Sequence, residues 1–222
     1  MLLEILQTAE RDKVAVGHFN ISDLAALKAI VECARELNKP VLIGLSEGER
    51  TFIGIREAVA FLRLTRDQYG QNVFLNADHT HSLAKAEAAA KAGCDLILFD
   101  GSSLSFEANV LQTKKAVETI KSINPGILVE GEIGYIGDSS KIHDRMPSGL
   151  SRHTTPEEAC EFVESTHVDL LAPAVGNMHG VLKSMVYGTE EKRLNIDAIA
   201  PSRKPRASFS LSTADPAPMK MI

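Results

Sequence analysis

A short segment in the first half of the chain ends an apolar run in a carboxylate and imidazoles. The segment is VFLNADHTHS, residues 73–82, in which the apolar residues give way to Asp78 and His79. On a strand these two side chains point to opposite faces, so both reach one site only where the strand bends. A carboxylate beside an imidazole lets one group carry a proton while the other binds a metal. The alternative is that Asp78 caps the following turn and His79 is an ordinary loop residue.

A second segment favours the metal interpretation. It is AVGNMHGVLK, residues 174–183, which places His179 just beyond another strand-like run and follows it with Gly180, where backbone can come close to a ligand. Glu132 lies near the end of a third run. Imidazole nitrogens and carboxylate oxygens are typical ligands of divalent metals. We therefore interpret His79, His179 and Glu132 as a candidate metal site.

Glu130 and Glu132 are two residues apart and therefore face the same way on a strand. Buried like charges are costly unless a cation or hydrogen-bond donors neutralise them. The pair is compatible with a nearby cation, and the alternative is that each carboxylate is structural and satisfied by hydrogen bonds.

The elements that position these residues alternate regularly along the chain. Six apolar runs are typical of buried strands: residues 14–20, 40–46, 73–79, 96–102, 128–134 and 170–176. Intervening stretches such as 23–38, 82–93 and 107–123 repeat apolar residues every three or four positions, which predicts amphipathic helices. Thr155, Pro156 and Glu158 predict the start of a further helix, and Gly93 suits a left-handed helix end. Apolar strands separated by helices indicate a parallel sheet covered on both faces.

Polar residues at the carboxyl ends of the predicted strands favour a barrel. A doubly wound sheet usually has a glycine-rich turn after its first strand, and GHFNISD, residues 17–23, lacks G-x-G-x-x-G. A TIM (β/α)8 barrel instead builds its site from many strand ends. Here those ends carry Asn20, Ser46, Asp78 with His79, Asp100, Glu132, and Asn177 with His179. The predicted α/β fold is therefore a TIM barrel, incomplete because about six of eight strands can be counted.

The chain is expected to divide at residue 200. Residues 1–200 are predicted to form the partial barrel, and residues 201–222 an irregular tail. The tail holds four of the nine prolines and shows neither a helical nor a strand period.

Composition narrows the class of protein. The formal net charge is −5 and basic residues are interspersed with acids, which does not favour nucleic-acid binding. Cys33, Cys94 and Cys160 are scattered, as is typical of reduced thiols in a cytoplasmic protein. No apolar run reaches the roughly 18 residues of a membrane span, and early acidic residues argue against a signal peptide. We predict a cytoplasmic protein that acts on a small molecule.

Five motifs in order resemble one enzyme family. GHFNISD, NADHTHS, FDGSSLSFEANV, VEGEIGYIG and VGNMHGVLK resemble the class II, zinc-dependent ketose-bisphosphate aldolases, over about residues 5–199. The resemblance implies a TIM barrel, a Zn²⁺ cofactor and reversible aldol cleavage of a ketose 1,6-bisphosphate to dihydroxyacetone phosphate and an aldehyde. It also implies a homo-oligomer, because family members are commonly dimers or tetramers.

The resemblance assigns roles to individual residues. It implies that His79 and His179 bind zinc and that Asp78 moves the proton of the C4 hydroxyl. Asp100 and Glu132 match positions that hold a second metal in some members. Substrate contacts are expected from Asn20, Ser46, Gly180 and Lys183. Lys183 is a candidate phosphate contact, with a solvent-facing lysine as the alternative.

Residues 135–154 resemble a mobile loop that closes over substrate in members of the family. Asp138 or Asp144 could supply a further acid or base there. The remaining candidates are expected to be ordinary surface or loop residues: His81, His143, His153 and His167.

Two family motifs are missing. Family members continue with a strand similar to LTLHGGSG, which supplies the third zinc histidine, and with N-I-[DN]-T; neither string occurs here. Permitted codons for residues 209–221, read two bases later, give LTLHGGSGTDED. We therefore expect a frameshift near Ala200, which the encoding DNA would test. Because a catalytic zinc usually has three protein ligands, the chain is expected to be a poor or inactive aldolase.

Two other functions fit the same residues. A metal-dependent barrel hydrolase needs similar ligands to activate water, and it would form no triose phosphate. A non-catalytic remnant would bind sugar phosphates without cleaving them. The leading hypothesis is the aldolase.

Overall fold

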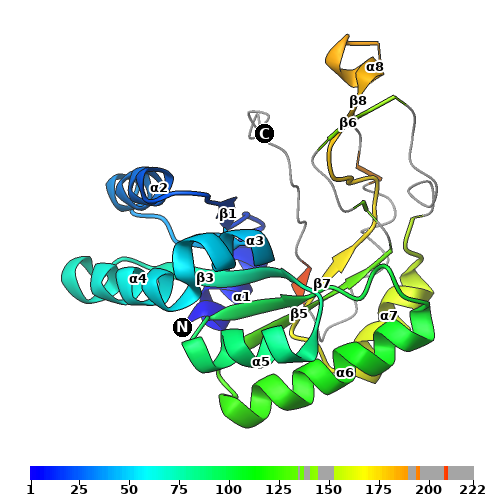
Figure 1. Cartoon of the computed structure of the whole chain (residues 1–222), viewed down its shortest axis with the longest axis horizontal. Coiled ribbons are helices and arrows are strands. Elements are labelled where there is room, and N and C mark those ends of the chain that lie inside the picture. The colour runs from blue at the N-terminus through cyan, green and yellow to red at the C-terminus, as the bar shows by residue number, and fades with distance from the viewer. Residues whose placement is uncertain (135, 138–140, 145–152, 190–193, 196–207, 210–222) are drawn as a thin grey trace.

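One curled parallel sheet organises the chain, in the strand order β1-β2-β3-β4-β5-β7-β9 (Figure 1). The computed structural model describes residues 1–134, 136–137, 141–144, 153–189, 194–195 and 208–209. The strands of the sheet are β1 Gly17–Asn20, β2 Val41–Leu45, β3 Val73–Thr80, β4 Leu96–Phe99, β5 Leu128–Ile133, β7 Leu170–Pro173 and β9 Ser208–Phe209. A second, two-stranded sheet pairs β6 Ile142–His143 with β8 Val181–Leu182.

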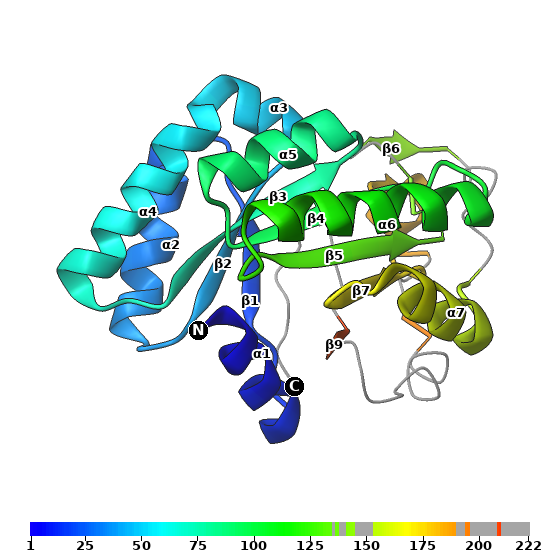
Figure 2. The same ribbon diagram turned by 90° about the horizontal axis from the view of Figure 1, so that it is seen from below.

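Helices cover the outer face of the curled sheet, as in the wall of a barrel. They are α2 Leu24–Glu36, α4 Ile55–Tyr69, α5 Leu83–Ala92, α6 Phe106–Ile123 and α7 Pro156–Thr166. Figure 2 shows them as an arc around the strands. Outward side chains such as Ile43, Leu75 and Ile97 belong to the large apolar cluster between strands and helices. Among the described residues, no helix is both long and apolar enough to cross a membrane.

The inner face carries an apolar layer at the amino ends of five strands, which we call the floor. Its side chains are Leu42, Phe74, Leu96, Leu128 and Leu170. Helix α1, Leu2–Asp12, packs against the floor through Leu2, Ile5 and Leu6. The inward residues of a barrel form packed layers rather than a pore, and this is one such layer.

Farther along the same strands the inner face becomes polar. Asn76 and Asp78 follow Phe74 at two-residue steps, and Glu130 and Glu132 follow Leu128 in the same way. We call these four residues the polar rim: Asn76, Asp78, Glu130 and Glu132. All four are buried. The strand period of two therefore places polar side chains directly above the apolar floor, at the carboxyl ends of the strands.

The helix start predicted at Thr155 and the helix end predicted at Gly93 are both present in the structure. The Thr155 hydroxyl accepts a hydrogen bond from the Glu158 N–H, while the Glu158 carboxylate accepts one from the Thr155 N–H. Pro156 follows in the first turn of α7. Gly93 ends α5 at a φ of 94°, a left-handed conformation that glycine adopts without steric cost.

The prediction of an incomplete TIM barrel is confirmed, because β1 to β5 and β7 form a curled half-barrel of parallel strands. The run expected at residues 170–176 is a strand only as far as Pro173, whose nitrogen carries no hydrogen for the ladder.

One part of the predicted irregular tail is a strand. Ser208–Phe209 pair in parallel with Leu170 and Leu171 of β7, and no other described strand pairs with this edge of β7. The other residues of the predicted tail, and Ala200 where a frameshift is expected, lie outside the described residues.

Candidate metal centre and active site

The ladder between β3 and β4 is interrupted at Asp78 and His79. Between Ala77 and Thr80, β3 contains one residue more than the paired stretch of β4, which is a β-bulge. His79 has a φ of 43°, a left-handed conformation that is uncommon for a residue other than glycine. The bulge has the consequence that Asp78 and His79, although adjacent in sequence, both face the inner side of the sheet.

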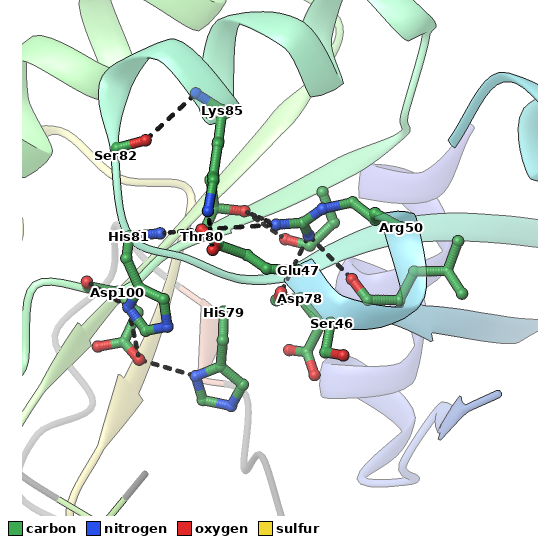
Figure 3. A network of polar contacts seen from close by, with 12 residues as sticks. Ser46, Glu47, Arg50, Asp78, His79, Thr80, His81, Ser82, Lys85 and Asp100 are labelled. Atoms are coloured by element: carbon green, nitrogen blue, oxygen red, sulfur yellow. Dashed lines mark hydrogen bonds and ion pairs between the residues drawn. The ribbon is translucent and has the colours of Figure 1, made fainter. Parts of the chain in front are cut away.

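His79 contacts residues from three other places in the chain. Its Nδ1 donates a hydrogen bond to Asp100 Oδ2 at 2.8 Å (Figure 3). Nδ1 also lies 3.3 Å from Glu132 Oε2, and the His79 ring centroid is 4.8 Å from that of His179. Nε2 is buried and has no hydrogen-bond partner within the described ranges. An imidazole that donates from one nitrogen to a carboxylate and leaves the other free has the usual arrangement of a metal ligand.

His179 arrives from the segment that follows β7. Its N–H donates to the carbonyl oxygen of Ile136 at 2.7 Å, so the segment after β5 holds its backbone. Gly180 follows with a φ of 73°, where a side chain would be unfavourable. The structure thus brings together two imidazoles that are 100 positions apart in the sequence.

Hydrogen bonding sets the protonation of the His79 and Asp100 pair. Burial alone would lower the pKa of His79, but the hydrogen bond to Asp100 and the contact with Glu132 outweigh it and raise the pKa to about 11. Burial alone would raise the pKa of Asp100, but His79 and Ser102 lower it to about 2. Ser102 donates to Asp100 Oδ1 from its N–H and its hydroxyl. A cation that binds at His79 must therefore displace a proton.

The carboxyl groups of the polar rim repel one another. Burial raises the pKa of Glu130 to about 8, and Asp78 and Glu132 act in the same direction. Burial also raises the pKa of Glu132 to about 7, against the contact with His79. Asp78 Oδ1 and Glu132 Oε2 are buried without a hydrogen-bond partner in the part of the chain that the structure describes. Crowded carboxylate oxygens without a hydrogen-bond partner are the groups that a cation would stabilise.

The residues present fit a divalent metal. His79, Asp100 and Glu132 each offer one ligand atom, and these atoms lie within 4.8 Å of one another. The unpaired Nε2 of His79 and the neighbouring His179 ring add nitrogen donors at the same place. This mixture of nitrogen and oxygen donors suits zinc and related metals rather than calcium or magnesium.

Asp78 is held from β1. Asn20 Nδ2 donates a hydrogen bond to Asp78 Oδ2 at 2.8 Å. The Asn20 side chain crosses Gly44 of β2, where a Cβ atom would lie 2.1 Å from Asn20 Oδ1. His18 crosses the same glycine and lies 3.5 Å from Asn76 Nδ2. His18 was not predicted as a site residue, although strand alternation places it on the face of Asn20, two residues away.

Two predicted substrate contacts have other partners. Ser46 caps the short helix α3, Glu47–Glu49: its hydroxyl accepts from the Glu49 N–H, while its own N–H donates to the Glu49 carboxylate. Lys183 begins α8, Lys183–Val186, and forms an ion pair with Asp144. Figure 1 shows α8 on a projection beyond β6 and β8. Asp138, like most of the predicted mobile loop, lies outside the described residues.

One of the histidines expected to be ordinary lies beside the candidate site. His81 is exposed, but its Nδ1 is 3.3 Å from the carbonyl oxygen of Asp100 and its ring is 6.4 Å from the His79 ring. The other three lie in β6, before α7 and at the end of α7: His143, His153 and His167.

Asn109 of α6 supports Glu132 from the outer face, and sequence analysis did not single it out. Its Nδ2 donates to the carbonyl oxygen of Glu132 at 2.8 Å, and its Oδ1 accepts from the Thr113 hydroxyl at 2.9 Å. Gly101 leaves room for this amide, because a Cβ there would lie 2.2 Å from Asn109 Oδ1. The available signal was an amide among the buried residues of an amphipathic helix.

The chain is similar to proteins of one known family. A model of the family "Fructose-bisphosphate aldolase class-II" matches residues 1–210. The fructose-bisphosphate aldolase of Staphylococcus aureus (strain Mu50 / ATCC 700699) is 36% identical over 183 residues, which are 81% of this chain and 62% of the relative. The fructose-bisphosphate aldolase of Helicobacter pylori (strain J99 / ATCC 700824) is 35% identical over 184 residues, 81% of this chain and 58% of the relative.

A solved structure shares the fold. The YdjI aldolase from Escherichia coli K12 matches with a TM-score of 0.74 at 25% identity, covering 95% of this chain and 70% of that one. The chain spans about three-fifths of the length of the two curated relatives, 62% and 58%. Since the family match extends over most of the chain, the resemblance of the five motifs is confirmed. The chain belongs to the class II fructose-bisphosphate aldolase family.

Proposed function

We propose that the reaction of this protein is reversible aldol cleavage of a ketose 1,6-bisphosphate to dihydroxyacetone phosphate and an aldehyde, and that turnover is impaired in the chain as given. The observation that carries this proposal is the convergence of His79 and His179, with a ring-centroid separation of 4.8 Å, beside the buried carboxylate of Asp78. Membership of the family and the names of the relatives support the same reaction class.

In this proposal Asp78 moves the proton of the C4 hydroxyl. Asn20 donates to Asp78 Oδ2, which leaves Oδ1 buried and without a hydrogen-bond partner among the described residues. A buried carboxylate oxygen that is held in orientation but not paired is suited to accept a hydroxyl proton during cleavage. It would return that proton in the condensation direction.

The proposed metal is zinc, with His79 through Nε2 and His179 as ligands. Asp100 and Glu132 would orient His79 or hold a second cation at the positions predicted from the sequence. A bound zinc supplies Lewis acidity, which stabilises the negative charge that develops on substrate oxygens as the carbon–carbon bond breaks.

The proposed substrate contacts are Asn20, Ser46, Gly180 and Lys183. Gly180 would present backbone close to the substrate, in keeping with its φ of 73°. Lys183 would contact a phosphate group only by exchanging its ion pair with Asp144 for the phosphate oxygens.

We also propose that the protein is a cytoplasmic homo-oligomer, as the resemblance and the scattered cysteines suggest.

A coupled assay for triose phosphate tests the function. The chain would be stripped with EDTA, reloaded with zinc and supplied with fructose or tagatose bisphosphate. Asp78→Asn is expected to lower turnover about 10²- to 10⁴-fold, because it removes the proton carrier. His179→Ala is expected to abolish zinc-dependent turnover, because it removes a zinc ligand. His153→Ala is the matched control, since His153 contacts Asn195 rather than the candidate centre.

Other outcomes of the same assay contradict the aldolase. Release of inorganic phosphate or an acid without triose phosphate would indicate a metal-dependent hydrolase. Zinc-independent sugar-phosphate binding without cleavage would indicate a binding remnant.

Nanomolar zinc affinity in the 222-residue chain would contradict the separate expectation that its activity is impaired. Activity that appears only after the tail is restored to the LTLHGGSG frame would support that expectation.

A further inference from the structure

The Arg50 side chain joins the carboxyl ends of two strands. Arg50 is the first residue of the π-helical turn η1, Arg50–Gly54, and its side chain is 9% exposed. Nη1 donates to the carbonyl oxygens of Leu45 at 2.8 Å and of Asp78 at 3.0 Å. Nη2 donates to the Thr80 hydroxyl at 3.1 Å (Figure 3). One guanidinium therefore contacts the end of β2 and both sides of the bulge in β3.

These contacts satisfy carbonyl groups at the end of the ladder between β2 and β3, whose last pair is Leu45 with Ala77. The Thr80 hydroxyl, which accepts from Arg50, donates in turn to the carbonyl oxygen of Ala77 at 3.1 Å. Regular pairing resumes where the Asp100 N–H donates to the carbonyl oxygen of Thr80 at 3.0 Å. Because buried backbone carbonyls need hydrogen-bond partners, Arg50 and Thr80 make the bulge tolerable inside the protein.

The bulge matters because it aims two neighbouring side chains at one place. In a regular strand His79 would point to the outer face, away from Asp100 and Glu132. The left-handed backbone of His79, with a φ of 43°, persists in a residue with a side chain only when its surroundings enforce it. Arg50 is one of the groups that enforce it, since it donates to the carbonyl of the residue before His79.

We propose that Arg50 is a positioning residue whose guanidinium holds the Asp78–His79 bulge and thereby aims both side chains into the candidate site. It reacts with nothing and acts through the backbone of Asp78. The consequence for metal binding rests on the function proposed above, whereas the consequence for the conformation of His79 does not.

The same strand offers a matched control at its other end. Arg66 of α4 donates from Nε to the carbonyl oxygen of Val73, the first residue of β3, and forms an ion pair with Asp95. Arg66 therefore also fixes β3 by contacts to a carbonyl and a side chain, but at the amino end, away from the bulge. A general loss of strand stability would follow from changing either arginine.

The first experiment measures metal affinity in Arg50→Lys, Arg50→Ala and Arg66→Ala by titrating EDTA-stripped protein with zinc alone. Both Arg50 variants are expected to bind zinc about 10- to 100-fold more weakly, the usual cost of changing a residue that orients a ligand. A lysine ammonium cannot reproduce the fork that reaches three acceptors. Arg66→Ala is expected to lower Tm but leave zinc affinity within about twofold of the wild type. Non-denaturing guanidinium chloride, at tens of millimolar, is expected to restore much of the affinity of Arg50→Ala only.

Equal zinc affinity in folded Arg50 variants and wild type would overturn the proposal, and so would an equal loss in Arg66→Ala. Should wild type itself fail to bind zinc, the proposed function fails, and the metal-free structure of Arg50→Lys then decides the inference. That structure is expected to show His79 at a negative φ with its contact to Asp100 broken. An unchanged bulge would overturn the positioning role even if the aldolase assignment stands.

Discussion

The floor and the polar rim occupy the same inner face of the sheet, and on β3 and β5 the first rim residue follows the floor residue by two positions. The floor is entirely apolar and closed by α1, so its side chains contribute to stability through burial. The polar rim is equally buried, yet three of its oxygens have no hydrogen-bond partner in the described part of the chain. A protein tolerates such groups where a ligand will satisfy them. The floor therefore stabilises the half-barrel, and the polar rim is available for chemistry at a cost in stability.

The largest expected difference comes from Leu128→Ala in the floor. Leu128 is 4% exposed, and truncation of a buried leucine loses its transfer free energy and leaves a cavity, so the free energy of unfolding should fall by about 3 kcal/mol. Urea unfolding of Leu128→Ala and of the volume-conserving Leu128→Met measures this difference. The methionine variant should lose less than about 1.5 kcal/mol. Comparable losses in the two variants would show that the floor is not tightly packed.

Asn109→Ala tests the support beneath the polar rim. It leaves the carbonyl of Glu132 and the hydroxyl of Thr113 without their present partner, which should cost about 2 kcal/mol of unfolding free energy. Thr113→Val is the control, because Asn109 still reaches Glu132 in that variant. An Asn109→Ala loss no larger than that of Thr113→Val would contradict the supporting role.

The free energy of unfolding of the metal-free protein should depend on pH through the polar rim and not through the apolar floor. The pKa of Glu130 is raised from 4.5 to about 8 by burial and by Asp78 and Glu132, so the folded state holds its proton more tightly than the unfolded state. The stabilisation that comes from the bound proton of Glu130 is complete below pH 4.5 and is lost as the pH rises through about 8. Glu130→Gln should therefore reduce the fall in unfolding free energy between pH 5 and 7 by about 1.4 kcal/mol per pH unit. Parallel stability curves for the two proteins in EDTA would contradict this.

The smallest effect on stability is expected for Gly44→Ala. Asn20 and His18 are exposed and can turn away from the new Cβ, so the unfolding free energy should change by no more than about 0.5 kcal/mol. The hydrogen bond from Asn20 to Asp78 would nevertheless be lost. If turnover is measurable, it should fall in Gly44→Ala as far as in Asn20→Ala, and wild-type turnover would show that this bond is dispensable.

The architecture could be predicted from the sequence because the local sequence patterns and the global fold agree. Strand and helix periodicity, the Thr155 cap and polar strand ends all indicate the barrel, and the structure has these elements. The convergence of His79 and His179 also followed from the expectation that parallel strands end at one edge.

The bulge was not accessible in the same way. His79 has a left-handed backbone conformation, which a residue other than glycine does not predict. The contact proposed to enforce this conformation comes from Arg50, 28 residues before Asp78. Likewise, strand periodicity shows which face Asn20 occupies but not that Gly44 must be small for its side chain to reach Asp78. Long-range side-chain contacts carry this information, and a local pattern does not contain them.

Helix α1 has a consequence for how the chain folds. Leu2 packs into the same apolar layer as Leu170, so its contacts are complete only after the last strand of the half-barrel has been synthesised. Contacts between such distant residues slow folding and prolong the exposure of unpaired strand edges. Expression yield should therefore depend on temperature and chaperones.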